Sequence, residues 1–311
     1  MIEPLWTERY RPKTLSDTIL PTSLKATLQA FLDKNELPNL LFVGSAGVGK
    51  TTVARAMVEE LGGEFYIINA SMKGNIDTLR TEIQDYASTL SFGGGRKYVI
   101  LDEADHLNPQ STQPALRNFM EEFSTNCGFI LTCNYRDRII EPLRSRCAEV
   151  PFKFNRADTE TLAGHFFKRV LGILAENNVE FDKTTVAEVV KLYMPDWRRV
   201  LNELQRYSAT GRIDTGILAA HSDDNIKRLL QDVKDKNFTA VRKWVAENDA
   251  VSGSEFFRRL YEQGVQALDP KSIPQLILIL ADYGYKQAFA ADQQINTAAC
   301  LVEIMASCSF K

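Results

Sequence analysis

A glycine-rich segment, Gly44-Ser45-Ala46-Gly47-Val48-Gly49-Lys50-Thr51, has the residue types and spacing of a loop that binds phosphate. Its glycines allow the tight turns that bring several backbone N–H groups to one anion, and a following helix N-terminus favours negative charge. Lys50 would then reach the β- and γ-phosphates of a nucleotide, and the Thr51 hydroxyl would bind Mg²⁺. A glycine-rich turn without a ligand is the alternative. The expected nucleotide-binding residues here are Gly47, Val48, Gly49, Lys50, Thr51 and Thr52.

A second motif, which is acidic, is Asp102-Glu103-Ala104-Asp105, and it follows the apolar run at 98–101. Asp102, at the end of a buried strand, can hold the Mg²⁺ shell, and Glu103 can polarise and orient an attacking water. This pair predicts a hydrolase rather than a small-molecule kinase. A solvated strand end is the alternative for Glu103, and Asp105 could equally cap the next helix. A helicase would need a second nucleotide-folding half of about 150 residues, for which the chain has no room.

Three further polar residues stand beside apolar runs. Asn134 ends the run at 129–133, and its amide could sense the γ-phosphate and hold the water; an ordinary turn asparagine is the alternative. Arg146 lies on a loop and could enter a neighbouring subunit's nucleotide site, whereas loop arginines are usually only solvated. Asp196 predicts a helix cap, and Arg198 in that helix could return to the γ-phosphate or remain a solvated charge.

The elements that must position these residues fall into three parts. Residues 1–153 alternate strands and helices, which predicts an α/β domain with a parallel sheet, helices on both faces and ligand loops at the carboxyl ends of its strands. Residues 154–221 have helical apolar spacing and form a small lid. Residues 222–311 are helical and richer in apolar residues than an isolated bundle requires, at 273–280 and 297–305.

Bulk composition excludes several classes of protein. A net charge of −3 argues against a protein that coats DNA with its whole surface, although a basic inner face remains compatible with it. The five cysteines show no C-x-x-C pairing, so neither a zinc ribbon nor a disulfide framework is indicated. The chain shows no membrane-length apolar run and no signal sequence. We therefore expect a cytoplasmic protein without membrane partners.

Six features occur in the order seen in AAA+ clamp-loader ATPase subunits of the replication factor C type, and the chain resembles this family over most of residues 4–210. The triplet Ser145-Arg146-Cys147 is quite specific to the family. Within the family, Pro195-Asp196-Trp197-Arg198 is most similar to the large subunits of tailed-phage clamp loaders. The features are the N-terminal segment at 6–17, the phosphate loop, the acidic motif, the segment at 113–121, Ser-Arg-Cys, and Asp-Trp-Arg-Arg at 196–199.

The resemblance implies an AAA+ nucleotide domain, a helical lid and a helical collar that packs against neighbouring subunits. ATP and Mg²⁺ are the implied cofactors, and the Arg146 finger acts on the adjacent subunit. Residues 7–10 resemble the strip that clasps the adenine in this family, with Ile19 packing against the base. The sequence departs from the family at Arg9, where a lysine is often found, and at residues 74–77, where Gly-Asn-Ile-Asp replaces the usual Arg-Gly-Ile-Asp. The implied adenine-binding residues are Thr7, Glu8, Arg9, Tyr10 and Ile19.

The implied partners are a sliding clamp, primer-template DNA, copies of the chain itself and a companion subunit. Gln113 could relay DNA engagement to the catalytic site or be a plain helix-surface residue. Two rival functions share the nucleotide residues: another AAA+ DNA motor or remodelling ATPase, and a nucleotide-binding scaffold without turnover. The DNA-contact candidates are Lys73, Arg80 and Arg117, each of which could instead be an ordinary solvated charge. The clamp-contact candidates are Tyr86, Leu90 and Phe92, of which Tyr86 and Leu90 could instead simply cover the sheet.

Overall fold

The computed structural model describes residues 5–72, 76–89, 91, 96–209, 211–213, 223–248 and 254–311. The chain divides into two compact units, Met1–Ile213 and Asp214–Lys311. Within the described segments, no helix combines the length and the hydropathy needed to cross a membrane.

The first unit is built on a parallel sheet of five strands in the order β2-β3-β4-β1-β5. The strands are short and almost wholly apolar in the centre of the sheet, as expected where both faces are covered. This order places the carboxyl ends of β1, β3 and β4 next to one another, and the predicted α/β class is confirmed. The strands are β1 (Leu40–Val43), β2 (Glu64–Asn69), β3 (Lys97–Asp102), β4 (Cys127–Cys133) and β5 (Ala148–Pro151).

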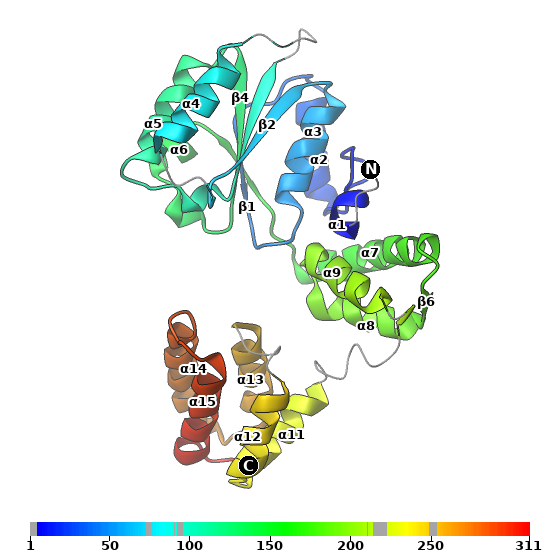
Figure 1. The fold of residues 1–311 in the computed structure, drawn as a ribbon, viewed down its shortest axis with the longest axis vertical. Helices are drawn as coiled ribbons and strands as arrows, with labels where there is room; N and C mark the ends of the chain where they lie inside the picture. Colours follow the sequence, from blue (N-terminus) through cyan, green and yellow to red (C-terminus); the bar gives the residue numbers. More distant parts are fainter. Residues whose placement is uncertain are drawn as a thin grey trace. The chain divides into compact units, whose positions relative to one another are not determined.

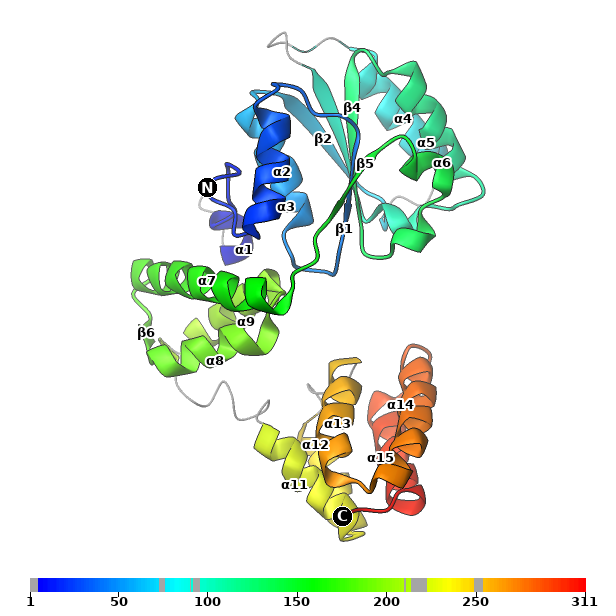
Figure 2. The same ribbon diagram turned by 180° about the vertical axis from the view of Figure 1, so that it is seen from behind.

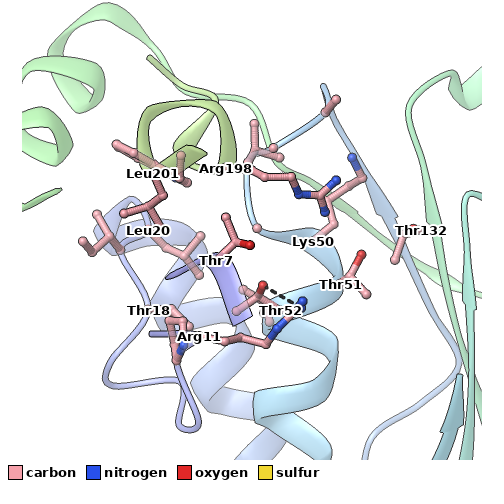
Figure 3. A pocket seen from close by; sticks show the side chains of 18 of the residues that line it. Thr7, Arg11, Thr18, Leu20, Lys50, Thr51, Thr52, Thr132, Arg198 and Leu201 are labelled. Carbon is pink, nitrogen blue, oxygen red and sulfur yellow. Dashed lines mark hydrogen bonds between the residues drawn. The ribbon is translucent and has the colours of Figure 1, made fainter. Parts of the chain in front are cut away.

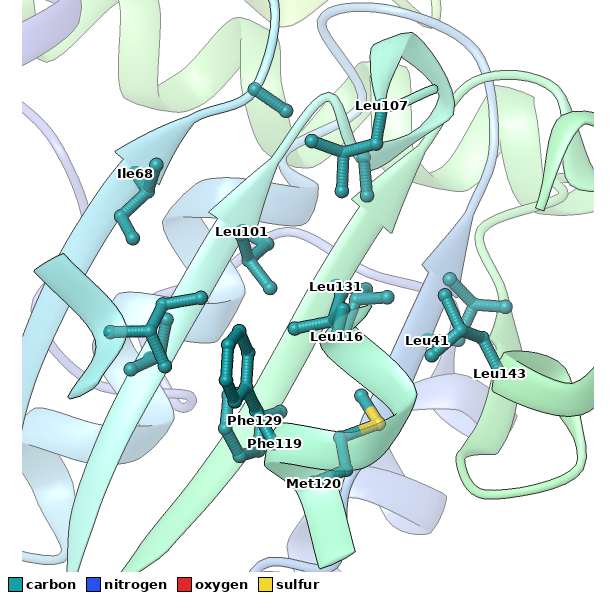
Figure 4. Packing of buried hydrophobic residues seen from close by; sticks show 14 of the residues in the cluster. Leu41, Ile68, Leu101, Leu107, Leu116, Phe119, Met120, Phe129, Leu131 and Leu143 are labelled. Atoms are coloured by element: carbon teal, nitrogen blue, oxygen red, sulfur yellow. The ribbon is translucent and has the colours of Figure 1, made fainter. Parts of the chain in front are cut away.

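Helices cover both faces of the sheet (Figures 1 and 2). Side chains alternate along each strand, so Phe42 packs on the side of α2 and α3 while Leu41 packs on the side of α4, α5 and α6. Figure 4 shows this second core, in which Phe119 and Met120 of α5 meet Phe129 of β4. The helices are α2 (Thr22–Leu32), α3 (Lys50–Glu60), α4 (Ile76–Ala87), α5 (Thr112–Glu122) and α6 (Glu141–Arg144).

Three shorter elements flank the sheet's carboxyl edge. α1 (Trp6–Arg9) lies in the N-terminal strip, which we define as residues 5–20. η1 (Ala104–His106) follows β3, and η2 (Arg136–Arg138) follows β4. The strip continues from α1 into the core of the α2 and α3 side, where Leu15 is fully buried.

The lid consists of α7 (Arg156–Glu176), α8 (Lys183–Tyr193) and α9 (Trp197–Ser208), with β6 (Glu180–Phe181) paired in parallel to β7 (Arg212–Ile213). Side chains cap each helix: Asn155 forms a capping box on α7, and Asp182 and Asp196 accept backbone N–H groups of α8 and α9. The predicted cap at Asp196 is thus confirmed. So is the apolar spacing of α7, whose Leu162, Phe166, Val170 and Leu174 are all buried.

The second unit is helical. Its core includes Phe256, Leu260 and Leu276, and it also exposes large apolar side chains. Those on α14 and α15, and on the turn between them, are Ile277, Leu278, Tyr285, Phe289, Ile295 and Val302. The helices are α11 (Asp223–Lys234), α12 (Phe238–Glu247), α13 (Ser254–Ala267), η4 (Pro270–Ser272), α14 (Ile273–Gln287) and α15 (Gln293–Ser307).

Candidate active site

A pocket lies where the N-terminal strip, the phosphate loop, the ends of β3 and β4 and the lid helices α7 and α9 meet. Its walls combine the polar ends of the central strands with apolar side chains from the strip and the lid. The pocket therefore offers a polar end suited to phosphates and an end suited to a flat ring. Of the predicted site residues, it is lined by Thr7, Glu8, Tyr10, Ile19, Gly47, Val48, Gly49, Lys50, Thr51, Thr52, Asp102, Glu103, Asn134 and Arg198.

The phosphate loop connects β1 to α3 and needs glycine at two places. Gly47 and Gly49 have φ values of 74° and 94°, in the left-handed region that side chains rarely adopt. Gly47 also lies against the lid, because a Cβ built there would be 1.7 Å from Oδ1 of Asp196. The Trp197 N–H donates to the Gly47 carbonyl at 3.2 Å. The loop and the first turn of α9 are therefore in direct contact.

Lys50 is almost completely buried at the start of α3. Its Nζ donates to the carbonyls of Gly44 and Ser45 at 2.9 and 2.8 Å, and to Oδ1 of Asn134 at 2.9 Å. Burial lowers the pKa of this ammonium below its ordinary value; Arg198 adds to the effect, and Asp102 opposes it. Figure 3 shows the side chains of Lys50 and Arg198 converging from α3 and α9. Two cations that converge on one end of a pocket predict an anionic ligand.

Thr51 and Asp102 supply adjacent oxygen atoms at the ends of the loop and of β3. The Thr51 hydroxyl donates to Oδ1 of Asp102, and Thr132 of β4 donates to the same oxygen at 2.6 Å. Hydroxyl and carboxylate oxygens suit Mg²⁺, which prefers oxygen ligands and completes its shell with phosphates and water. The residues present therefore fit this ion. Thr132 was not predicted, because nothing in the apolar run at 129–133 marks a hydroxyl as functional.

Glu103 stands at the turn between β3 and η1 and lines the pocket. Its φ is 56°, a left-handed conformation that costs free energy for a residue with a side chain. Its N–H donates to the Thr132 hydroxyl at 3.1 Å, which holds the turn. Backbone strain at a residue on a pocket wall is typical of a functional position.

Two polar residues near this edge are structural in ways that the sequence did not predict. Asp105 does not cap a helix: its Oδ2 accepts the N–H groups of Asn134 and Tyr135, both at 3.2 Å. Gln113 is fully buried, so the helix-surface interpretation is wrong. Its amide donates to the carbonyls of Leu107 and Arg138 and accepts the Ile140 N–H, which ties α5 to the segments around η2.

The strip residues differ in where they face. Thr7, Glu8, Tyr10 and Ile19 line the pocket, but Arg9 does not; its Nη2 lies 3.2 Å from Oε1 of Glu176 at the end of α7. The pocket has further walls that sequence analysis missed. Some of these lining residues belong to the strip, and others belong to faces of α7 and α9 whose apolar spacing indicated only a core. They are Arg11, Thr18, Leu20, Phe166, Arg169, Trp197 and Leu201.

Arg146 is absent from the walls of its own chain's pocket, as a finger acting on a neighbour would require. The guanidinium pairs with Oε1 of Glu121, and its Nη1 donates to the Pro142 carbonyl at 2.8 Å. The residue is exposed on the turn after α6. Its action in trans stays a prediction.

The predicted DNA and clamp contacts are only partly described. Lys73, Leu90 and Phe92 lie outside the described residues. Arg80 is exposed on α4, and the Arg117 guanidinium donates to Oδ1 of Asn118 at 3.1 Å. Tyr86 packs against the core beside Tyr66, and burial raises its pKa to about 12. Tyr86 therefore covers the sheet, which was the alternative to a clamp contact.

Comparison with known proteins identifies both parts of the first unit. Residues 40–154 match the model of the ATPase family associated with various cellular activities (AAA), and residues 158–219 match the AAA+ ATPase lid domain of sliding-clamp-loader large subunits. The sliding-clamp-loader large subunit of Enterobacteria phage T4 is 31% identical over 314 residues, covering 99% of this chain and 98% of the relative. The chain belongs to the sliding-clamp-loader family of AAA+ ATPases.

Other relatives of this clamp-loader ATPase extend the family beyond phages. The replication factor C small subunit of Haloarcula marismortui is 31% identical, covering 97% of this chain and 95% of the relative. Among solved structures, the RuvB Holliday junction branch migration motor of Thermotoga maritima has a TM-score of 0.56 at 17% identity, covering 84% of this chain and 93% of that one. That similarity shows a shared AAA+ fold. The clamp-loader relatives, by contrast, establish an ATP-hydrolysing enzyme of DNA replication.

Proposed function

We propose that this chain, with neighbouring subunits and ATP, grips a ring-shaped sliding clamp, opens it on primer-template DNA, and releases it after hydrolysis. The observation that carries the proposal is the convergence of Lys50, Asp102, Glu103 and Asn134 on one pocket, with Arg198 entering it from the lid. The names of the relatives supply the clamp as the partner, since the pocket itself is shared by other AAA+ enzymes.

Each pocket residue has a role in this proposal. The loop N–H groups and Lys50 bind the phosphates, and Thr51 with Asp102 would hold Mg²⁺, which neutralises charge on the transferring phosphoryl group. Glu103 orients the attacking water and accepts its proton. Asn134, already bonded to Lys50, holds that water against the γ-phosphate. The strip residues Thr7, Glu8, Tyr10 and Ile19 enclose the adenine.

Two arginines couple ATP to assembly. Arg198 contacts the γ-phosphate from the lid of the same chain, and Arg146 contacts that of the neighbouring subunit. A ligand shifts a conformational equilibrium only through contacts that differ between states. Both arginines provide such contacts, because each belongs to an element that ATP must draw toward the phosphate. ATP would thus favour the closed spiral of subunits that holds an open clamp.

The lid, the collar and polar residues outside the pocket have further roles in this proposal. Residues 154–221 act as the lid and 222–311 as the collar, whose exposed side chains on α14 pack against neighbours in the assembly, including copies of this chain and a companion subunit. Arg80 and Arg117 contact DNA phosphates without reading sequence, since several subunits repeat the same contacts along the backbone. Gln113, which joins α5 to η2, relays that engagement to the site.

A pull-down with the sliding clamp encoded by the same genome tests the proposal. The full chain, assembled with its companion subunit, should capture the clamp with a non-hydrolysable ATP analogue and lose most of it without nucleotide. Lys50→Ala should abolish both ATP binding and ATP-dependent capture, because the phosphate cradle loses its positive charge. A matched change at an exposed lysine, Lys168→Ala, should leave both intact. Equal capture with and without nucleotide would contradict the ATP-driven cycle.

A further inference from the structure

Arg169, in the fourth turn of α7, lines the nucleotide pocket and was not among the predicted site residues. Its Nη1 donates to the Asp17 carbonyl at 2.6 Å, and its Nη2 donates to the Tyr10 carbonyl at 3.3 Å. One guanidinium of the lid thus holds two points of the N-terminal strip.

The chemistry of this contact is specific to arginine. Arg169 forms no ion pair within the described residues, and its partners are neutral carbonyl oxygens. Partial burial lowers the pKa of the guanidinium, so the site keeps a cation at a cost in desolvation. The planar guanidinium carries donors on separate nitrogens, and its Nη1 and Nη2 here reach different carbonyls. A lysine has a single donor nitrogen in place of these two.

The held segment shapes the end of the pocket assigned to the base. Tyr10 lines the pocket at one bonded carbonyl, and Thr18 and Ile19 line it directly after the other. Between these ends the strip is fixed to the α/β layer, because Leu15 is fully buried and its N–H donates to Oε2 of Glu60 at 2.8 Å. With the middle of the segment anchored, Arg169 sets the position of the two ends that face the pocket.

A second contact joins the same two elements. Nδ2 of Asn177, just after α7, donates to the Tyr10 hydroxyl at 2.8 Å. Tyr10 is therefore bonded to the lid through both its carbonyl and its side chain. A shift of α7 would move Tyr10 relative to Leu15, which stays in the core.

We propose that Arg169 is the positioning residue for base recognition: it spans Tyr10 and Asp17, sets the width of the base-binding end of the pocket, and makes that width depend on the position of the lid. The inference rests on the proposed nucleotide site and adds to it the residue by which the lid responds to the base. The ligand class is an adenine nucleotide, as distinct from a bare phosphate chain.

Calorimetry on the full chain with MgATP, MgGTP and Mg-tripolyphosphate tests the proposal. Arg169→Met keeps the aliphatic stem but removes both hydrogen bonds, so ATP affinity should fall about tenfold. The preference for ATP over GTP should shrink, while tripolyphosphate affinity should change less than about twofold. Arg169→Lys, which keeps one donor group, should lie between Arg169→Met and the wild type. Lys168→Met, a neighbouring exposed lysine of α7, should match the wild type for all three ligands.

The outcomes separate this inference from the nucleotide site itself. If Lys50→Ala binds ATP as the wild type does, the phosphate site is wrong. If Lys50→Ala loses ATP but Arg169→Met retains wild-type affinity and selectivity, only the role of Arg169 is wrong. An equal loss of ATP and tripolyphosphate in Arg169→Met would also overturn it, since the residue would then act on phosphate or on folding. Should Arg169→Met not fold, Arg169→Lys decides by the same ratio of ATP to tripolyphosphate affinity, and an unchanged ratio in that variant would overturn the role of Arg169.

Discussion

The two units of the chain differ in the charged side chains that they bury and in the large apolar side chains that they expose. In the first unit, Lys50, Lys97 and Asp105 are buried charged residues, whereas none of the charged residues described in the second unit is buried. The first unit exposes the large apolar side chains Leu5, Met72 and Tyr135, and the second unit exposes a larger group that includes Leu278, Tyr285 and Phe289. Each unit therefore carries a feature that is costly for an isolated chain in water.

The contrast indicates what each unit binds. A buried cation is costly unless polar or charged partners compensate it, so Lys50 beside Arg198 favours an anionic ligand. Exposed apolar side chains in one region favour contact with another protein surface. The first unit is thus organised around a small charged ligand and the second around association. Substitutions in the first unit should therefore change nucleotide binding or turnover, and substitutions in the second unit should change association.

Arg146→Ala should have the largest effect, because it tests whether the nucleotide site of the first unit needs an arginine from a neighbouring subunit. Turnover of the assembled complex should fall about 1,000-fold, the effect of losing an arginine that stabilises transition-state charge. ATP binding to the isolated chain should stay within about twofold of the wild type. Arg136→Ala is the matched control, since Arg136 also forms a surface pair, with Glu149.

Mixed assemblies decide the direction in which Arg146 acts. An active site whose own chain carries Arg146→Ala should remain active when the neighbour that faces it is wild type. Loss of activity at that site would show that the arginine acts in cis.

Glu103→Gln should separate binding from hydrolysis within the first unit. The amide cannot accept the proton of the attacking water, so turnover should fall about 100-fold or more. ATP affinity should be retained, because Lys50 and the loop still bind the phosphates. Single-turnover hydrolysis and calorimetry measure the two quantities. Unchanged turnover would remove Glu103 from the catalytic role.

Leu278→Ser combined with Tyr285→Ser should affect only the second unit's function. Both side chains are exposed, so melting temperature should barely change, whereas subunit association should weaken about 30-fold, as expected for losing about 2 kcal/mol of interface anchors. Analytical ultracentrifugation measures the association. Gln275→Ser on the same helix is the control. Wild-type association in the double variant would show that these α14 side chains do not contribute to subunit association.

The pH dependence of ATP binding should show the smallest effect. Lys50 binds phosphate only when protonated, and burial lowers its pKa from 10.5, so affinity should begin to fall at a lower pH than for an ordinary lysine. Calorimetry with MgATP over a series of pH values up to 10.5 measures this fall in affinity. Lys50→Arg, which stays charged, should give a flat profile wherever its binding is measurable. An equally flat wild-type profile would contradict the lowered pKa.

Local pattern in the sequence was sufficient for much of this site. Glycine spacing predicted the phosphate loop, apolar runs at 40–43 and 98–101 predicted parallel strands, and Asp196 predicted a helix cap. These features depend on residues a few positions apart, whose hydrogen bonds and periodicity are encoded locally. The roles of Arg146 and the N-terminal strip required family resemblance in addition.

Only the tertiary structure decided the contacts made over long separations. Thr132 reaches Asp102 because β4 pairs with β3 in the register that sets Leu131 beside Leu101. Arg169 reaches Tyr10 across 159 positions, while Arg9, one residue from Tyr10, turns to Glu176 instead. Strand order, register and lid docking fix such pairs, and they arise from the packing of the whole core. No spacing in the sequence marks them, because the free energy that selects them is shared among many distant residues.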